Sequence, residues 1–134
     1  IVGYTGEAAE VTVPQTLDGH SVTRIGDEAF FACDFLTGVT LPEGLTSIGN
    51  LAFRNCSSLT GITLPEGLTD IGAFAFSGCP SLTGIALPEK LTSIASDTFE
   101  ECPENMLFTV VRNSYAAKWC EENGKNYIYS DSLE

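Results

Sequence analysis

Five cysteines are the side chains whose types and spacing first suggest chemistry. Cys33, Cys56, Cys79 and Cys102 follow one another at a constant step of 23 residues, and Cys120 stands outside that step. A column of thiols could bind a metal ion or form disulfides, or it could be a set of small buried side chains donating S–H groups to backbone carbonyls. A disulfide needs Cβ atoms about 3.8 Å apart and turned towards each other, whereas in-register neighbours on adjacent coils lie about 4.8 Å apart and point the same way. The spacing therefore favours a buried structural ladder, and no cofactor is expected.

The single histidine offers a second possible chemistry. His20 lies between Asp18 and Ser21, and these three residue types also make up hydrolytic triads. All three fall within one turn, so they cannot converge as nucleophile, base and orienting group. The pair Asp18-Gly19 is typical of a tight turn. The sequence therefore predicts no catalytic residue here, and an enzyme is not expected.

Three glutamates repeat at the same step as the cysteines. Glu43, Glu66 and Glu89 should stack into a column of like charge along one edge. Calcium could bridge two of them, because it accepts carboxylate oxygens. The column has no D-x-D-x-D-G loop beside it, and Lys90 dilutes its charge. A solvated acidic edge without a metal ion is the expectation.

These positions recur because the whole chain is repetitive. Leu59 to Cys79 reads LTGITLPEGLTDIGAFAFSGC, near-copies begin at Leu36 and Leu82, and a looser copy spans residues 11–33. Each copy contains an L-x-x-I-x-L strand, a proline turn, a second short extended segment and a stretch suited to a short helix or 3₁₀ turn. One copy alone cannot offset its ordering entropy, so the copies must stack to build a core. A period of 20–29 residues is typical of leucine-rich solenoids.

The predicted fold is a β-rich α/β solenoid in a single domain, a right-handed leucine-rich-repeat superhelix of about four 23-residue coils. Residues 1–10 form an N-terminal cap, residues 11–104 the four repeats and residues 105–134 a C-terminal cap. Four columns of apolar side chains should form the core: Val11, Val39, Ile62 and Ile85; Val13, Leu41, Leu64 and Leu87; Ile25, Ile48, Ile71 and Ile94; and Phe30, Phe53, Phe76 and Phe99.

The two caps are expected to close the ends of the solenoid, which would otherwise expose apolar side chains and unpaired backbone. At the N-terminus a short strand is predicted over residues 1–4. At the C-terminus a strand over residues 107–113 should place Phe108 and Val110 in the Ile85 and Leu87 positions. A helix over residues 115–123, with Ser114 as N-cap and Gly124 as its stop, and a final strand over residues 127–130 should follow.

Composition limits the functions open to this chain. The 134 residues carry 18 Asp and Glu against 6 Lys and Arg, a net charge of −12, so binding to nucleic acid is not expected. No apolar run approaches the roughly 18 residues that span a bilayer, so membrane insertion is not expected either. The chain begins with Ile1 rather than Met, which favours a processed or excised piece of a longer protein. A monomer is expected.

The repeat unit C-x-x-L-x-x-I-x-L-P-x-x-L-x-x-I-x-x-x-A-F-x-x-C resembles the BspA-like, or Treponema-type, leucine-rich repeat family. The motifs LPEGLTSIG, LPEGLTDIG, AFRNC and AFSGC carry the resemblance, and the tail NSYAAKWCEENGKNYIY resembles the usual closing segment of the family. Lys90, Ala95 and Thr98 depart from the pattern. The resemblance implies an extracellular module of a bacterial cell-surface or secreted protein, with adhesion to a host or neighbouring-cell protein as the usual role.

The candidate partner face consists of two rows of outward residues on the extended segments. Solenoids usually present such an extended concave surface to their partners, but these rows lack the Trp, Tyr and Arg that dominate binding hot spots. Two hypotheses therefore stay open: a protein-interaction or adhesion module, and a structural spacer or stalk with no ligand of its own. The main-strand row contains Thr12, Thr40, Thr63, Ala86 and Thr109, and the second row contains Thr23, Thr46, Thr69 and Thr92.

Overall fold

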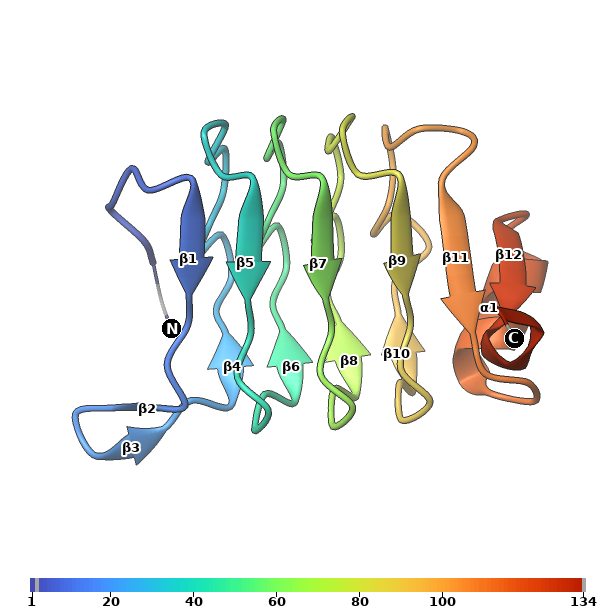
Figure 1. The fold of residues 1–134 in the computed structure, drawn as a ribbon, viewed down its shortest axis with the longest axis horizontal. Helices are drawn as coiled ribbons and strands as arrows, with labels where there is room; N and C mark the ends of the chain where they lie inside the picture. Colours follow the sequence, from blue (N-terminus) through green and yellow to red (C-terminus); the bar gives the residue numbers. More distant parts are fainter. Residues whose placement is uncertain (2, 134) are drawn as a thin grey trace.

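The computed structural model describes Ile1 and residues 3–133. In Figure 1 the chain descends through a strand at the front, turns, returns behind and advances towards the C-terminal end, which makes a right-handed superhelix. The predicted leucine-rich solenoid is confirmed. The solenoid has about five turns rather than four, because the strand predicted in the C-terminal cap, residues 107–110, stacks on the four predicted coils as a fifth front strand.

The front strands occupy the L-x-x-I-x-L segments of the repeat and run parallel to one another. Val11 pairs with Val39, Val39 with Ile62, and Phe108 with Ile85, so the register follows the predicted columns. These strands form two hydrogen-bonded sheets, β1-β5-β7 and β9-β11-β12, and no ladder joins β7 to β9. The front strands are β1 (Glu10–Thr12), β5 (Gly38–Thr40), β7 (Gly61–Thr63), β9 (Gly84–Ala86) and β11 (Leu107–Val110), with β12 (Asn126–Tyr129) at the C-terminal edge.

The rear strands are only two residues long but form one continuous parallel sheet. Its order is β4-β6-β8-β10, and Ile25, Ile48, Ile71 and Ile94 lie in register along it. These isoleucines are buried, as the third predicted column requires. The rear strands are β4 (Arg24–Ile25), β6 (Ser47–Ile48), β8 (Asp70–Ile71) and β10 (Ser93–Ile94).

The segment after each rear strand is a run of turns. Of the predicted short helix or 3₁₀ turn, no helix is assigned in these segments, whereas bonds of the 3₁₀ type occur singly, such as that from the Phe31 N–H to the Glu28 carbonyl at 3.1 Å. Residues in the left-handed region recur at the repeat step, with φ of 59° at Glu28, 62° at Leu51 and 56° at Phe74. These turns also bond from coil to coil: the Phe30 N–H donates to the Ala52 carbonyl at 2.7 Å. The backbone of these segments therefore combines bonds within one turn with bonds between coils.

Phenylalanines from these turn segments stack along the solenoid axis. The rings of Phe30, Phe53, Phe76 and Phe99 lie 5.0, 5.3 and 5.5 Å apart between centroids, with interplanar angles of 2° to 4°. Tyr4 covers the N-terminal end of this stack at 5.3 Å. At the other end Phe108 and Trp119 meet Phe99 edge-on, which ends the column.

The C-terminal cap follows the prediction closely. Helix α1 (Tyr115–Glu122) begins at Ser114, whose hydroxyl accepts from the Ala117 N–H at 3.1 Å, and Gly124 follows it with a φ of 66°. Strand β12 then pairs with β11, and the 3₁₀ helix η1 (Ser130–Leu133) follows β12. Across the described residues no helix has the length and apolar character needed to cross a membrane.

The N-terminal cap differs from the prediction. The expected strand over residues 1–4 includes Val2, which lies outside the described residues, and no strand is assigned at Ile1, Gly3 or Tyr4. Ile1 nevertheless joins the edge of the rear sheet, because its amino group donates to the Arg24 carbonyl at 2.9 Å and its carbonyl accepts from the Gly26 N–H at 2.6 Å.

Candidate functional site

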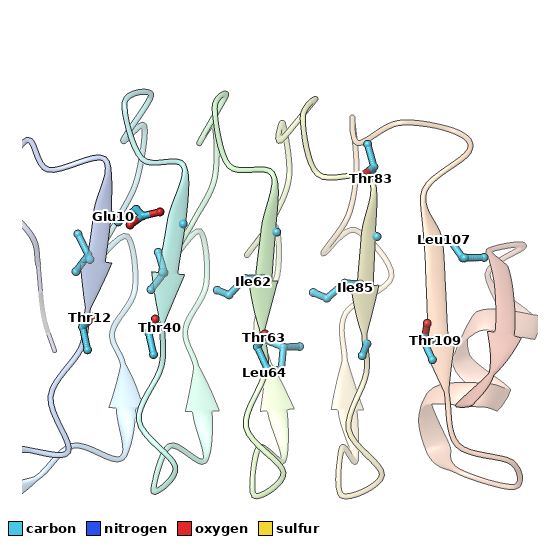
Figure 2. Close-up of a pocket in the computed structure, with 16 residues that line it drawn as sticks. Glu10, Thr12, Thr40, Ile62, Thr63, Leu64, Thr83, Ile85, Leu107 and Thr109 are labelled. Carbon is cyan, nitrogen blue, oxygen red and sulfur yellow. The ribbon is translucent and has the colours of Figure 1, made fainter. Parts of the chain in front are cut away.

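The outward residues of the front strands form a surface that we call the strand face. Figure 2 shows the side chains of Thr12, Thr40, Thr63 and Thr109 along it, one from each of four front strands. Thr12, Thr40 and Thr63 are exposed, as is Ala86, and Thr109 is half-buried. The hydroxyl groups of the four threonines make no hydrogen bond within the described residues, so they are available to bind another molecule.

A second outward row on the strand face is almost without side chains. Gly38, Gly61 and Gly84 occupy it in three adjacent coils, between Glu10 at one end and Leu107 at the other. None of the three has a positive φ, and a Cβ at Gly61 would meet no atom within 4 Å. The fold therefore does not need glycine at Gly61. This row was not among the predicted site residues, although the repeated T-G-[V/I] triplet marks it in the sequence.

Because of the glycine row, the strand face is a shallow groove. It has a volume of about 730 Å³ and extends from β1 to β11. At the ends of the strands it meets two further hollows of about 700 and 370 Å³ on the lower rim, which we define as residues 42–44, 65–67 and 88–90. Leu64 lines all three hollows, so they form one continuous depression.

The charge of this depression is mainly negative. Glu10 lies at its N-terminal end, and Glu43, Glu66 and Glu89 lie exposed in the turns of the lower rim, where the sequence predicted a solvated column. Lys90 is the one cationic side chain among the residues that line the three hollows. No group of three or more metal-ligating side chains is placed to hold an ion anywhere in the described residues.

The second threonine row lies just before the rear strands, and its hydroxyl groups are already engaged. Thr46 donates to the carbonyl of Thr23 at 3.2 Å, Thr69 to that of Thr46 at 3.0 Å, and Thr92 to that of Thr69 at 3.3 Å. Each hydroxyl thus joins one coil to the preceding one. The structure separates the two rows of the candidate partner face, and the rear row holds the coils together.

Next to the second threonine row, the outward side chains of the rear sheet form a polar chain across three coils. Arg24 donates to the Ser47 hydroxyl at 3.0 Å, and Ser47 donates to the Asp70 carboxylate at 2.7 Å. Arg24 also forms an exposed ion pair with Asp27 at 3.0 Å. The polar groups of this chain are therefore engaged with one another, in contrast to the strand-face hydroxyls.

The cysteine ladder lies inside the turn segments. Cys33, Cys56 and Cys79 are buried, Cys102 is half-buried, and all are free thiols. The Cys56 Sγ donates to the Phe30 carbonyl at 3.1 Å, and the next two members of the ladder repeat this contact with Phe53 and Phe76. Burial raises the pKa of the Cys56 and Cys79 thiols to about 12, so they are poor nucleophiles at neutral pH.

The histidine lies on a hairpin that projects from the first coil. Strands β2 (Thr16–Leu17) and β3 (His20–Ser21) are antiparallel, with Leu17 opposite His20. Asp18 and Gly19 both have positive φ, 52° and 80°, as a tight two-residue turn requires. Residues 15–21 are all exposed, and no hydrogen bond joins the side chains of Asp18, His20 and Ser21 in the described structure.

Comparison with known proteins identifies a family with this architecture. The family described as BspA type leucine rich repeat region matches residues 8–117 in six copies, two more than the four repeats predicted from the sequence. No match to this chain was found among curated proteins.

Three solved structures are similar in fold and sequence. A leucine-rich repeat protein from Bacteroides capillosus is 30% identical, with a TM-score of 0.71 and coverage of 78% of both chains. The T. pallidum leucine rich repeat protein is 30% identical, with a TM-score of 0.64 over 81% of this chain and 61% of that one. A leucine rich cell surface protein from Faecalibacterium prausnitzii is 27% identical, with a TM-score of 0.63 over 81% of this chain and 40% of that one.

This chain therefore spans less than two thirds of the T. pallidum and F. prausnitzii proteins. The family match, in contrast, covers most of the chain, from just before β1 to the first turn of α1. The resemblance carried by the repeat motifs is confirmed. The chain belongs to the BspA-type leucine-rich repeat family.

Proposed function

We propose that this chain is a non-catalytic protein-interaction module of a bacterial cell-surface or secreted protein, and that it binds a host or neighbouring-cell protein through the strand face. The observation that carries the proposal is the difference between the two threonine rows. Rear hydroxyl groups are engaged in bonds between coils, whereas the hydroxyl groups of Thr12, Thr40 and Thr63 are exposed and have no partner in the described structure. The groove beside them is large enough to receive part of a partner chain.

An extracellular location is supported by the similarity to the F. prausnitzii protein, which is described as a cell surface protein. Location on the surface of a cell would place the strand face within reach of proteins on other cells. The non-catalytic role is supported by the position of His20, the single histidine of the chain, on a projecting hairpin outside the groove.

A structural spacer is the second candidate function. It is favoured by the absence of Trp, Tyr and Arg among the residues that line the groove, because those residues dominate protein-binding hot spots. It is also favoured by the repeated bonds between coils along the rear of the solenoid. In that case the strand face would be ordinary exposed sheet.

Photo-crosslinking from defined positions separates the two functions. A photoreactive amino acid at Thr63 lies in the groove, and the same group at Thr92 lies on the rear side as a matched control. An interaction module should give a specific adduct with a cell-surface protein from Thr63 but not from Thr92, and excess unlabelled protein should suppress it. Equal labelling from both positions, or none from Thr40, Thr63 and Thr109, would support the spacer.

A further inference from the structure

We infer that the partner segment received by the strand face is an extended, positively charged stretch of polypeptide. This inference rests on the proposed function and adds the chemistry of the partner. It comes from the shape and the charge of the depression formed by the groove and the two hollows of the lower rim.

The shape favours an extended chain over a bulky globular surface. Gly38, Gly61 and Gly84 leave the backbone of three adjacent strands uncovered, so another backbone can approach closely. Glu10 and Leu107 line the groove at the two ends of this row, and Figure 2 shows the Glu10 side chain extending towards β5 and the Leu107 side chain pointing away from β9. A segment lying along the axis would therefore cross β5, β7 and β9 over exposed backbone.

The charge favours a basic segment. Four carboxylates line the depression against the single ammonium group of Lys90: Glu10, Glu43, Glu66 and Glu89. Two of the three arginines of the chain are already paired, since Arg24 bonds to Asp27 and Arg112 bonds to Asp131 at 2.8 Å. Such a field raises the local concentration of cationic partners and speeds their association.

The hollows of the lower rim suit the side chains of lysine and arginine. The wall of the 370 Å³ hollow contains one exposed apolar side chain, Ala86, together with the buried residues Leu64, Leu87 and Val110. Glu66, Glu89 and Lys90 lie in the same lining. A long basic side chain can lay its methylene groups on such a wall while its charged end reaches the carboxylates. The arrangement therefore accommodates both parts of these side chains.

Selection from a library of short random peptides tests the inference directly. The library is first depleted on Gly61→Trp, which fills the groove, and then selected on the wild-type protein. Gly61→Ala is the matched control, because it adds one methyl group in open space. Enrichment of lysine and arginine among peptides that bind wild type and Gly61→Ala but not Gly61→Trp is the expected result.

The charge contribution is then measured by fluorescence anisotropy with one selected peptide. Glu43→Gln/Glu66→Gln/Glu89→Gln should weaken binding about tenfold, as expected from the loss of three exposed charge pairs. The control Glu100→Gln/Glu121→Gln/Glu122→Gln changes net charge equally at exposed positions outside the depression and should bind like wild type. Binding should also weaken from about 0.1 M to about 1 M salt, where the Debye length falls from about 10 Å to about 3 Å.

The outcomes separate this inference from the proposed function. Groove-dependent peptides without enrichment in basic residues would overturn the inference and leave the proposed function intact. Failure to select any groove-dependent peptide would count against both. Equal loss of affinity in the two glutamine triples would show non-specific attraction to an acidic protein, and would also overturn the inference.

Discussion

The Cys79 Sγ donates a hydrogen bond to the carbonyl oxygen of Phe53, 26 residues earlier, at 3.2 Å. This contact joins the thiol of one coil to the backbone of the preceding coil, beside the stacked rings of Phe53 and Phe76. The same carbonyl accepts a longer hydrogen bond from the Cys56 N–H at 3.4 Å, so the thiol adds a second donor to it. The repeated cysteine thus combines small size with a weak donor.

Thiol reactivity should report the integrity of the stack. Cys56, Cys79 and Cys120 are buried, and burial raises the pKa of each thiol to about 12. In the folded protein we expect these three to resist a thiol-specific reagent at neutral pH, and all five cysteines to react in denaturant. Counting modified thiols by intact mass checks this, with Cys102, the half-buried member of the ladder, reacting first. Rapid modification of Cys79 under native conditions would contradict the proposed packing.

Stability should fall at alkaline pH for the same reason. Folding raises the pKa of Cys56 and Cys79 from 9.0 to about 12, so the folded state binds more protons than the unfolded state between these values. The stabilisation is complete below pH 9 and is lost as the pH rises towards 12, by at most about 1.4 kcal/mol per pH unit for each thiol. Urea denaturation between pH 8 and pH 11 measures this slope.

Tyrosines also ionise in that range, so the slope needs a control. Cys56→Ala/Cys79→Ala keeps every tyrosine and removes two of the titrating thiols. We expect the double variant to be less stable at pH 8 but to lose stability less steeply with pH. An unchanged slope would assign the pH dependence to other groups.

Two glycines of the repeat should respond in opposite ways to the same substitution. Gly78 has a φ of 70°, and a Cβ there would collide with the Oδ1 atom of Asn55. Gly78→Ala should therefore lower the free energy of unfolding by at least about 1–2 kcal/mol. Gly61 has ordinary φ and open space, so Gly61→Ala should raise it by roughly 0.4–1 kcal/mol. Midpoints of urea unfolding compare the two variants.

The collision can be separated from the backbone strain. Asn55→Gly removes the side chain that the new methyl group would meet, but Asn55 itself has a φ of 60°, so the single variant Asn55→Gly is the reference. Relative to it, Asn55→Gly/Gly78→Ala should lose less stability than Gly78→Ala loses relative to wild type, and the remaining loss is the cost of the left-handed φ at residue 78. Equal effects of alanine at Gly61 and Gly78 would show that the glycine row is required by the fold, and would weaken its assignment to binding.

The apolar columns could be predicted from the sequence because stacking places equivalent residues directly over one another. Val39 and Ile62 needed only the 23-residue step to be paired correctly. The turns could not be predicted, since Leu51 and Phe74 are bulky residues that rarely adopt positive φ. Leu51 is held in that conformation by a bond to the neighbouring coil, from its N–H to the Ala73 carbonyl at 2.9 Å, and by a bond within its own turn, from the Arg54 N–H to its carbonyl at 3.2 Å.

The candidate site could be predicted only in part from the sequence, because it too depends on contacts between coils. Thr63 and Thr69 are both outward threonines on extended segments, and the pattern treats them alike. Thr69 differs because its hydroxyl reaches the Thr46 carbonyl at 3.0 Å, a contact that depends on the spacing of the coils. The groove likewise depends on the absence of a side chain at Gly61. A pattern built from apolar residues does not include such a position, so it does not predict the groove.

The interruption between β7 and β9 is the least expected feature of the front face. The repeat would pair Gly84 with Gly61 and Ala86 with Thr63, yet no ladder joins these strands, although β8 and β10 pair behind them. The coils also bond in the turn segments, where the Phe76 N–H donates to the Thr98 carbonyl at 3.0 Å. The solenoid is thus closed at the rear and open at the front in its central region.

Hydrogen exchange should reveal this opening. In the preceding coils Gly61 pairs with Gly38 and Thr63 with Thr40, and the same register would pair Gly84 and Ala86 with β7. Without that ladder, we expect Gly84 and Ala86 to exchange at rates close to those of the unfolded chain, while Gly61 and Thr63 are protected. Residue-resolved exchange by NMR at neutral pH compares the two pairs within one molecule. The rear amides of Gly49 and Gly72, which donate to the carbonyls of Ile25 and Ile48 at 2.8 and 2.9 Å, serve as an internal standard for bonded coils. Equal protection of all four front amides would mean that β7 and β9 pair in solution and that the groove floor is a continuous sheet.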